Sequence, residues 1–237
     1  MKPGLYIVAT PIGNLEDFSI RSQKTLSKAD IIICENPKHS LKLLAKLGNK
    51  KKMYSLHDHN ENKIIKKIEN HALEYLVVLI SDAGSPLISD PGYKLVRFYI
   101  DKKLYVTTVP GPSSVISSLQ ISGMAINSFK FFGFVPKSNS RFEHFIENLK
   151  NEYQTSVFFV SSHRLILCLE ALQKNLNGRK ISVCKELTKL NEKIFRGYAR
   201  EIVEEIKQNK KYALGEFVIL VESANEKSND LEKINSS

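Results

Sequence analysis

Short apolar runs alternate with longer segments of helical periodicity over the first half of the chain. Four runs are apolar at nearly every position, which is typical of strands buried on both faces of a parallel sheet. They span residues 5–9, 29–34, 75–80 and 104–109. Helical spacing of apolar residues is found between and after these runs, over residues 19–27, 40–47, 60–73 and 92–102. This alternation predicts βαβ units and an α/β domain with a largely parallel sheet.

The second half of the chain has a different pattern. Its predicted strands lie closer together in sequence, at residues 130–136, 155–161, 181–186, 192–199 and 215–222. Helical patterns cover residues 141–151, 165–174 and 200–208. Closely spaced strands favour a mixed sheet, so we predict an N-terminal α/β domain over 1–112 and a C-terminal α/β domain over 113–222. Residues 223–237 offer little apolar surface to bury, and we expect a disordered polar tail.

Four loops rich in glycine, proline and small polar residues follow the predicted parallel strands. They span residues 10–17, 35–40, 81–92 and 110–114. In open α/β sheets, ligands bind outside the carboxyl ends of the strands. Small residues also allow a ligand to approach the backbone closely. We therefore expect a ligand site on this edge of the sheet, although the longest loop also fits a plain helix start with Asp90 as N-cap and Pro91 at the first helical position.

The familiar motifs of phosphate and metal chemistry are missing from the sequence. It has no GxGxxG, no GxxxxGK[ST], no HExxH and no GxSxG. The loops instead suit a ligand held by main-chain groups and apolar walls. The cysteines Cys34, Cys168 and Cys184 lie in or beside apolar segments without metal-ligand spacing, so we predict buried free thiols, no metal site and a reducing cytoplasm.

Charge adds a second indication of function. The formal net charge is +10 at pH 7, and a broad positive field favours a polyanion such as RNA. The alternative is a surface of solvated lysines without such a partner. No apolar run approaches the roughly 18–20 residues of a membrane helix, and the start of the chain lacks the pattern of a secretory signal. We therefore expect a cytoplasmic protein with no membrane contact.

Six segments, in order, resemble one known family. They read VATPIGNLED, LISDAGSPLISDPGYKLVR, VPGPSS, SSHRL, KELTKL and GEFV. Together they are similar to the ribosomal RNA small subunit methyltransferase I family, which belongs to the tetrapyrrole methylase-like class of S-adenosylmethionine (SAM) enzymes. The resemblance covers roughly residues 4 to 222.

The resemblance implies two α/β domains of the tetrapyrrole methylase type, with SAM in the cleft between them, and a homodimer. It implies methylation of the 2′-hydroxyl of a cytidine ribose in the decoding region of 16S rRNA, within the 30S subunit. By motif position it also implies a set of cofactor-binding residues: Ile12, Gly84, Ser85, Leu87, Ile88, Ser113 and Ser114.

The sequence departs from the family pattern at three places. Where the family usually has E-D-T-R-H, this chain reads ENPKHS from Glu35 onward, so that Asn36 replaces an acid and Lys38 an arginine. An arginine can bind a phosphate through two parallel hydrogen bonds, which a lysine cannot. Ser162 stands where proline is usual, and the chain ends soon after GEFVILVE, whereas many relatives continue with a basic extension.

A ribose hydroxyl is a weak nucleophile, so a nearby base would assist methyl transfer. By position the candidates are Glu35, His39 and Asp82. Each also has a structural interpretation: Glu35 as a helix cap, His39 as a surface residue, and Asp82 as an acceptor of backbone hydrogen bonds within the loops.

Contacts with RNA are predicted for three cations, Lys38, Arg164 and Lys189, because backbone neutralisation supplies much of RNA affinity. For Arg164 and Lys189 the alternative is ordinary ion pairing, for instance with Glu186. The aromatic residues Phe131, Phe132 and Phe134 would either stack on bases or pack in the core.

Two other functions remain open at this point. One is a methylase of tetrapyrrole or corrinoid precursors on the same scaffold, against which the positive charge and the DAGSPLISDPG loop argue. The other is a ribosome-binding relative that has lost activity, which the altered ENPKHS loop keeps open.

Overall fold

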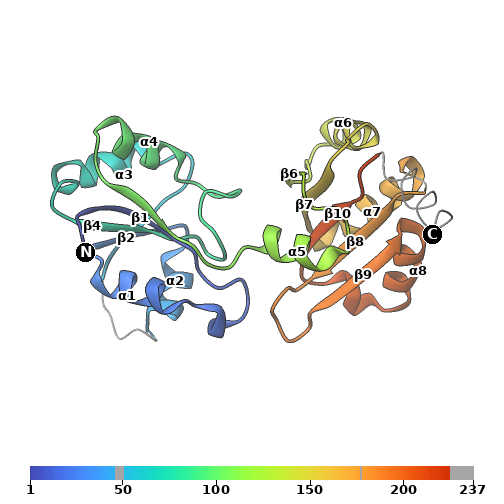
Figure 1. Cartoon of the computed structure of the whole chain (residues 1–237), viewed down its shortest axis with the longest axis horizontal. Helices are drawn as coiled ribbons and strands as arrows, with labels where there is room; N and C mark the ends of the chain where they lie inside the picture. The colour runs from blue at the N-terminus through green and yellow to red at the C-terminus, as the bar shows by residue number, and fades with distance from the viewer. Residues whose placement is uncertain (46–50, 177, 225–237) are drawn as a thin grey trace, which may run out of the picture. The chain divides into compact units, whose positions relative to one another are not determined.

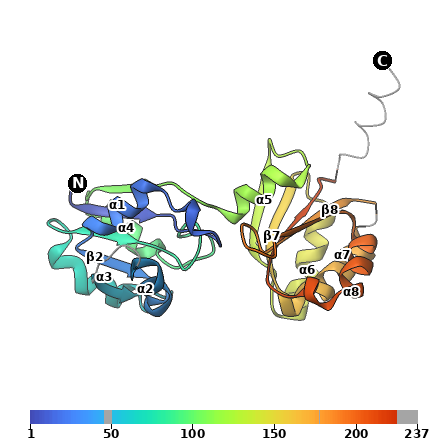
Figure 2. The same cartoon turned by 90° about the horizontal axis from the view of Figure 1, so that it is seen from below.

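A computed structural model describes residues 1–45, 51–176 and 178–224 of the chain. The described residues divide into two compact units, one up to Ser113 and the other from Ser114 onward (Figures 1 and 2). The division falls one residue after the predicted boundary. Both units are α/β, as the sequence predicts, and the predicted cofactor residues Ser113 and Ser114 lie on either side of the division.

The N-terminal unit contains a five-stranded parallel sheet in the order β3-β2-β4-β1-β5. The strands are β1 (Gly4–Val8), β2 (Ile31–Cys34), β3 (Lys52–Ser55), β4 (Leu76–Leu79) and β5 (Val106–Val109). β2 and β4 are buried at every position, which explains their continuous apolar runs. Strand β3 was not predicted. It lies at the edge of the sheet, where its sequence KMYS is only partly buried and carries no apolar run.

Helices cover both faces of this sheet (Figure 1). They are α1 (Ile20–Lys28), α2 (Pro37–Ala45), α3 (Glu61–Ile68) and α4 (Tyr93–Asp101), with short 3-10 turns at Leu15–Asp17 and Glu69–His71. Leu26 of α1 and Leu44 of α2 belong to one apolar cluster. Ile64 of α3 and Leu95 of α4 belong to a second cluster. The sheet is therefore wound on both sides, and all four predicted helices are present.

The start of α4 differs from the prediction. Its N-cap is Gly92, and no side chain of its own loop caps it, so Asp90 is not the N-cap. The buried carboxylate of Glu61 on α3 instead accepts hydrogen bonds from the backbone N–H groups of Lys94 and Leu95, at 2.9 and 3.1 Å. Because a residue distant in sequence caps the helix, the Asp90 side chain is left for another role.

The C-terminal unit contains a mixed sheet in the order β6-β7-β10-β8-β9. The strands are β6 (Phe129–Phe134), β7 (Thr155–Ser161), β8 (Lys180–Lys185), β9 (Lys193–Tyr198) and β10 (Glu216–Val221). Only β6 and β7 pair in parallel, and the remaining neighbours are antiparallel. This confirms the prediction of a mixed sheet.

Three helices pack on one face of the mixed sheet and share its core: α6 (Asn139–Lys150), α7 (Leu165–Asn175) and α8 (Ala199–Gln208). Helix α5 (Ser114–Ser122) lies on the other face (Figure 2). The sequence did not predict α5, because its residues SVISSLQIS alternate small polar and apolar side chains without a clear helical stripe. Two short 3-10 turns, at Ser162–Arg164 and Lys210–Ala213, complete the unit.

The described chain extends slightly beyond the predicted folded region. Ser223 and Ala224 are half-buried, and the Ala224 N–H donates to the Glu152 carbonyl at 2.9 Å, so these two residues do not belong to a disordered tail. The rest of the predicted tail, 225–237, lies outside the described residues. Within the described part of the chain no helix is both long and apolar enough to cross a membrane. All three cysteines are free and buried, as predicted.

Candidate functional site

Three of the four predicted loops are joined at the carboxyl edge of the parallel sheet. Thr10, after β1, and Gly84, after β4, exchange backbone hydrogen bonds of 2.9 and 3.0 Å. The Ser85 hydroxyl donates to the Pro112 carbonyl in the loop after β5, at 3.1 Å. These contacts fix the backbone of a loop that is much longer than the two to six residues usual between a strand and a helix.

Two features of the local structure require glycine at position 84. Its φ is +77°, in the left-handed region, and a Cβ there would lie 3.1 Å from the Ile12 side chain. A larger residue would be strained in backbone and crowded in space. Gly84 therefore brings the loops after β1 and β4 into close contact, and it does so through the buried side chain of Ile12.

The same loop continues in a strained conformation. Leu87 and Ser89 have φ values of +73° and +70° although neither is glycine. Non-glycine residues rarely adopt this region, and such strain clusters at functional sites. Leu87 packs against the core formed with α3 and α4. Ile88, which lies between Leu87 and Ser89 in sequence, is exposed. Of the predicted cofactor residues on this loop, Ile88 is thus the apolar side chain left uncovered by its own unit.

A cluster of carboxylates lies beside these loops. Glu35 follows β2, and Asp82 and Asp90 belong to the loop after β4. Glu35 and Asp90 line one small pocket whose other walls are mainly apolar. Burial, and next the negative charge of Glu35, raise the pKa of Asp90 to about 6. Burial, followed by the charge of Asp82, also raises the pKa of Glu35. The site therefore holds carboxyl groups that ionise closer to neutrality than ordinary acids do.

The altered ENPKHS segment keeps a regular helix start. The Asn36 side chain accepts hydrogen bonds from the N–H groups of Lys38 and His39, at 3.1 and 3.4 Å, and Pro37 is the first residue of α2. Asparagine and aspartate cap helices about equally well, so the replacement of the acid preserves this cap. The cap is not Glu35. Lys38 and His39 are both exposed on the first turn of α2.

Asp82 connects two of the loops. Its carboxylate accepts a hydrogen bond from the Asn36 N–H at 3.2 Å, which is the structural role considered for it in the sequence. A base role for Asp82 stays a prediction, as it does for Glu35 and His39.

Sequence reasoning missed a histidine segment next to Glu35. The Ser55 hydroxyl, at the end of β3, lies 2.8 Å from the Glu35 carbonyl oxygen and 2.9 Å from His57 Nε2. The rings of His57 and His59 stack with centroids 5.4 Å apart. The charge of His57 lowers the pKa of Glu35, opposing the stronger effect of burial. The histidines are visible in the sequence as HDHN after KMYS, but their position near Glu35 could not be inferred without knowing that β3 pairs with β2.

Two of the predicted RNA-binding cations lie in the C-terminal unit. Arg164 stacks over the Phe142 ring at 4.9 Å and donates to the Lys137 carbonyl at 3.0 Å. Lys189 forms salt bridges with Glu186 at 2.9 Å and Glu216 at 2.8 Å. The ion pairing with Glu186 considered as an alternative is thus present for Lys189, and contact with phosphate stays a prediction for both cations.

The aromatic residues of β6 pack mostly on neighbouring rings. Phe131 and Phe134 each lie edge-on to Phe159, and Phe132 lies edge-on to Phe145. Phe131 and Phe132 are half-buried, while Phe134 is 61% exposed. The core interpretation accounts for the first two, and only Phe134 presents most of its surface to solvent.

Comparison with known proteins identifies the class. The family profile of tetrapyrrole (corrin/porphyrin) methylases matches residues 4–203. Two solved structures have the same fold: a cobalt precorrin-4 methyltransferase of cobalamin biosynthesis (TM-score 0.65, 16% identity, 92% of this chain and 94% of that one) and the methyltransferase CobJ (TM-score 0.66, 15% identity, 94% and 95%). At these identities the likeness concerns the fold alone.

Relatives at higher identity define the group within this class. The ribosomal RNA small subunit methyltransferase I of Xylella fastidiosa is 39% identical over 94% of this chain and 82% of its own length. Those of Rickettsia prowazekii and Thermotoga maritima are 42% and 38% identical, over 93% and 92% of this chain and 79% and 97% of their own lengths. The chain belongs to the ribosomal RNA small subunit methyltransferase I family, within the tetrapyrrole methylases, and its cofactor is SAM.

The residues at the loop edge suit this cofactor. SAM carries a positive sulfonium and a positive ammonium group, and the carboxylates Glu35, Asp82 and Asp90 provide negative charge in a chain that is otherwise basic. Gly84 and Ser85 offer small side chains, and Ile12 and Ile88 offer apolar surface. Among the described residues no group of three or more His, Cys, Asp or Glu side chains is arranged to hold a metal ion.

Proposed function

We propose that this protein methylates the 2′-hydroxyl of a cytidine ribose in the decoding region of 16S rRNA, with SAM as methyl donor. The observation that carries the proposal is 38–42% identity, over more than nine-tenths of the chain, to relatives named ribosomal RNA small subunit methyltransferase I. The net charge of +10 supports an RNA substrate. An assembled ribosomal subunit as partner would place the reaction in the cytoplasm.

SAM supplies an electrophilic methyl group, which the 2′-oxygen attacks in line with the departing sulfur. Alignment of these atoms accounts for much of the rate in such a displacement. In this proposal the joined loops carrying Ile12, Gly84 and Ser85 hold the cofactor, and Leu87 supports the loop from the core. Ile88, Ser113 and Ser114 contribute further contacts. The hydrogen bonds of Thr10 and Ser85 fix the backbone before the ligand arrives, which lowers the entropy cost of binding.

Glu35 is the base that we favour. Burial raises its pKa, and the charges of Asp82 and His57 act on that pKa in opposite directions, so its carboxylate is a better proton acceptor than a solvated one. In the proposed step Glu35 takes the proton of the 2′-hydroxyl as the oxygen attacks. His39 is exposed at the rim, and Asp82 already accepts the Asn36 N–H, so both fit positioning roles better.

Lys38, Arg164 and Lys189 are proposed to contact phosphates. The surroundings of Lys38 and Lys189 predict phosphate contacts of different strength. Lys38 is exposed and forms no salt bridge within the described part of the chain, whereas Lys189 would have to share its ammonium with two carboxylates.

The proposal is tested on ribosomes. Deletion of the gene should remove one 2′-O-methyl group from a cytidine of the decoding region, as detected by mass spectrometry of nuclease fragments. Purified protein with SAM should restore the group on the strain's own 30S subunits. Methylation of a base, of another rRNA region, or of a corrinoid precursor instead would contradict the proposal.

The inactive alternative is separated by a second measurement. A ribosome-binding relative without activity would bind 30S subunits but show no SAM binding in calorimetry. Because Asn36 keeps the helix cap and Glu35 keeps its acidic neighbours, we expect SAM binding and turnover. Glu35→Gln should lose most of the rate but weaken SAM binding much less, because Asp82 and Asp90 still supply negative charge.

A further inference from the structure

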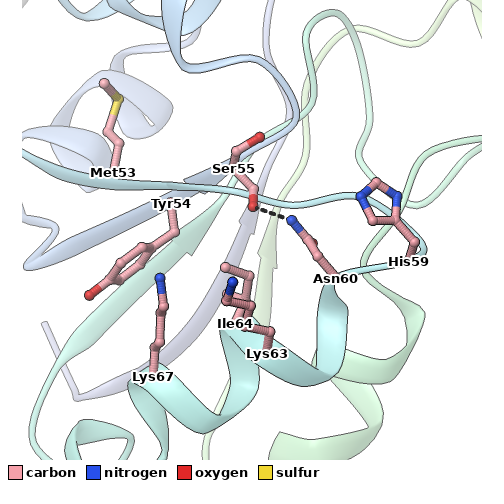
Figure 3. Close-up of a pocket in the computed structure, with 8 residues that line it drawn as sticks. All are labelled: Met53, Tyr54, Ser55, His59, Asn60, Lys63, Ile64 and Lys67. Carbon is pink, nitrogen blue, oxygen red and sulfur yellow. Dashed lines mark hydrogen bonds between the residues drawn. The ribbon is translucent and has the colours of Figure 1, made fainter.

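A second cleft lies between edge strand β3 and helix α3, and Ser55 is its link to the site described above. Its volume is about 510 Å³, and it is lined by residues of β3, of α3 and of the segment between them: Met53, Tyr54, Ser55, His59, Asn60, Lys63, Ile64 and Lys67. Figure 3 shows the long side chain of Lys67 extending from α3 toward Tyr54 of the strand. The volume lies in the range of sites that bind small ligands or single nucleotide units.

The lysines in and beside this cleft have no acidic partner among the described residues. Lys63 and Lys67 are four residues apart and lie on one face of α3. The ammonium groups of Lys67 and Lys52 each lie 5.4 Å from the centroid of the Tyr54 ring. Within the described ranges, none of the three lysines forms a salt bridge. The two ammonium groups beside the Tyr54 ring repel each other, so an anion in the cleft would relieve that repulsion.

The neutral polar groups of the cleft are largely occupied. The Asn60 side chain accepts from the His57 N–H at 2.8 Å and donates to the Ser55 carbonyl at 3.1 Å. The Ser55 hydroxyl is engaged with Glu35 and His57. The groups left to meet a ligand are therefore the lysines, the Tyr54 ring and exposed His59, a set that favours phosphate and a stacked base over an uncharged ligand.

The cleft is connected to the candidate active site through the sheet. Ser55 pairs with Cys34 in the register of β3 and β2, and Glu35 is the next residue after Cys34. The Ser55 hydroxyl contacts the Glu35 carbonyl oxygen at 2.8 Å. A polymer lying along β3 in this cleft would therefore arrive at the edge where Glu35 and Asp90 are placed.

We propose that this cleft binds the sugar-phosphate backbone of single-stranded RNA next to the nucleotide being methylated, with Lys63 and Lys67 on phosphates and Tyr54 beside a base. This inference rests on the proposed function and adds where the RNA lies. RNA fits better than a free nucleotide because Ser55, which lines the cleft, contacts the Glu35 carbonyl oxygen of the carboxylate site, so that a polymer bound in the cleft can reach that site.

The experiment compares two double variants matched in charge and helical spacing. Lys63→Ala/Lys67→Ala removes the cleft cations, and Lys24→Ala/Lys28→Ala removes two exposed lysines four residues apart on α1. Filter binding to 30S subunits and to 16S rRNA is measured over a salt series. SAM affinity by calorimetry and the melting temperature are measured for both variants.

Loss of two single-strand phosphate contacts should reduce the log–log salt slope by about 1.4, which is roughly a 20-fold loss of affinity at 0.1 M salt. The α1 variant should retain a slope close to wild type. Both variants should keep wild-type SAM affinity and melting temperature.

Three outcomes would overturn the inference. Equal losses in both variants would mean that only the overall positive field matters. An unchanged slope in the Lys63→Ala/Lys67→Ala variant would exclude phosphate contact, and a loss of SAM affinity would assign the cleft to the cofactor. If the wild-type protein itself bound neither 30S subunits nor 16S rRNA, the proposed function would fail, a result distinct from these three.

Discussion

At the scale of single residues, Asp90 shows how surroundings change an ordinary acid. Its loop places it in a small, mainly apolar pocket with Glu35. Burial and the neighbouring charge disfavour its ionised form, so its pKa rises from 3.8 to about 6. Only the Ser81 hydroxyl acts in the opposite direction to a notable extent. A group with this pKa changes its charge just below neutral pH, where enzymes place acids and bases.

The raised pKa makes Asp90 a cost to stability at neutral pH. Between pH 3.8 and about 6 the unfolded chain loses this proton while the folded chain keeps it, so stability falls as pH rises through that window. Asp90→Asn cannot ionise and avoids this loss. We expect the variant's melting temperature, relative to wild type, to increase between pH 4 and pH 7.

Thermal denaturation followed by circular dichroism at several pH values measures the effect. Asp101→Asn is the control, because it removes an exposed carboxylate of α4 whose salt bridge with Arg97 is solvent-accessible and contributes little. A relative melting temperature of Asp90→Asn that does not change with pH would contradict the assignment of Asp90 to this pocket.

Two glycines with nearly equal φ separate backbone strain from close packing. Gly84 has φ +77°, and a Cβ added there would lie 3.1 Å from the Ile12 side chain. Gly123 has φ +76°, and a Cβ added there would meet no atom within 4 Å. Alanine at Gly123 should cost only the left-handed conformation, about 1 kcal/mol. Alanine at Gly84 should cost more, and it should also weaken SAM binding by displacing the loop. Chemical denaturation and calorimetry measure both effects.

One outcome would contradict this prediction for Gly84. If Gly84→Ala and Gly123→Ala lost equal stability and both bound SAM normally, the contact between Gly84 and Ile12 would not position the cofactor site.

At the scale of elements, the beginning of α4 depends on α3. Glu61 is buried at 4% exposure, and its carboxylate accepts two backbone N–H groups of α4. A negative charge at a helix N-terminus is favourable, and this contact holds the end of the long loop after β4. The loop that carries Gly84 and Asp90 is thus anchored at its far end by a neighbouring helix.

Removal of this cap should be costly. Glu61→Ala leaves two N–H groups without a partner in a buried place, and we expect a loss of about 2 kcal/mol in the free energy of unfolding. Glu61→Gln keeps an acceptor oxygen and should lose less. Urea denaturation measures both, with Glu69→Ala as the control, because its 3.7 Å salt bridge to Lys102 is exposed and should matter by under about 0.5 kcal/mol. A loss for Glu61→Ala no greater than that of Glu69→Ala would show that the cap is not needed.

At the scale of the whole molecule, the protein is basic overall but acidic at its candidate active site. The chain carries a net charge of +10, which attracts RNA over long distances. The candidate active site is locally acidic, because Glu35, Asp82 and Asp90 lie so near one another that neighbouring negative charge, after burial, raises the pKa values of Glu35 and Asp90. A basic surface with an acidic site suits an enzyme whose substrate is an anion and whose cofactor carries a cation.

The resemblance to the family also predicts a homodimer. The monomer mass is 26.9 kDa, so light scattering at micromolar concentration should give twice that value, 2 × 26.9 = 53.8 kDa. A mass that stayed near 26.9 kDa across a dilution series would contradict the prediction.

The sequence by itself determined most of the elements and the class of the protein. Strands such as β2 and β4 are buried on both faces, so their apolar runs were unmistakable, and the motifs from VATPIGN to GEFV indicated the family. Edge strand β3 and helix α5 were missed because packing, and not a local pattern, makes them form.

What only the tertiary structure decided is which residues act together. Asp90 fits an N-cap in sequence, but Glu61, 29 positions earlier, caps α4 instead, and Asp90 lines the small pocket with Glu35. His57 is near Glu35 only because β3 pairs with β2. Local patterns record how each segment satisfies its own backbone and buries its own face. Burial, electrostatic coupling and long-range hydrogen bonds arise only when segments distant in sequence pack together, and these interactions set the chemistry of the site.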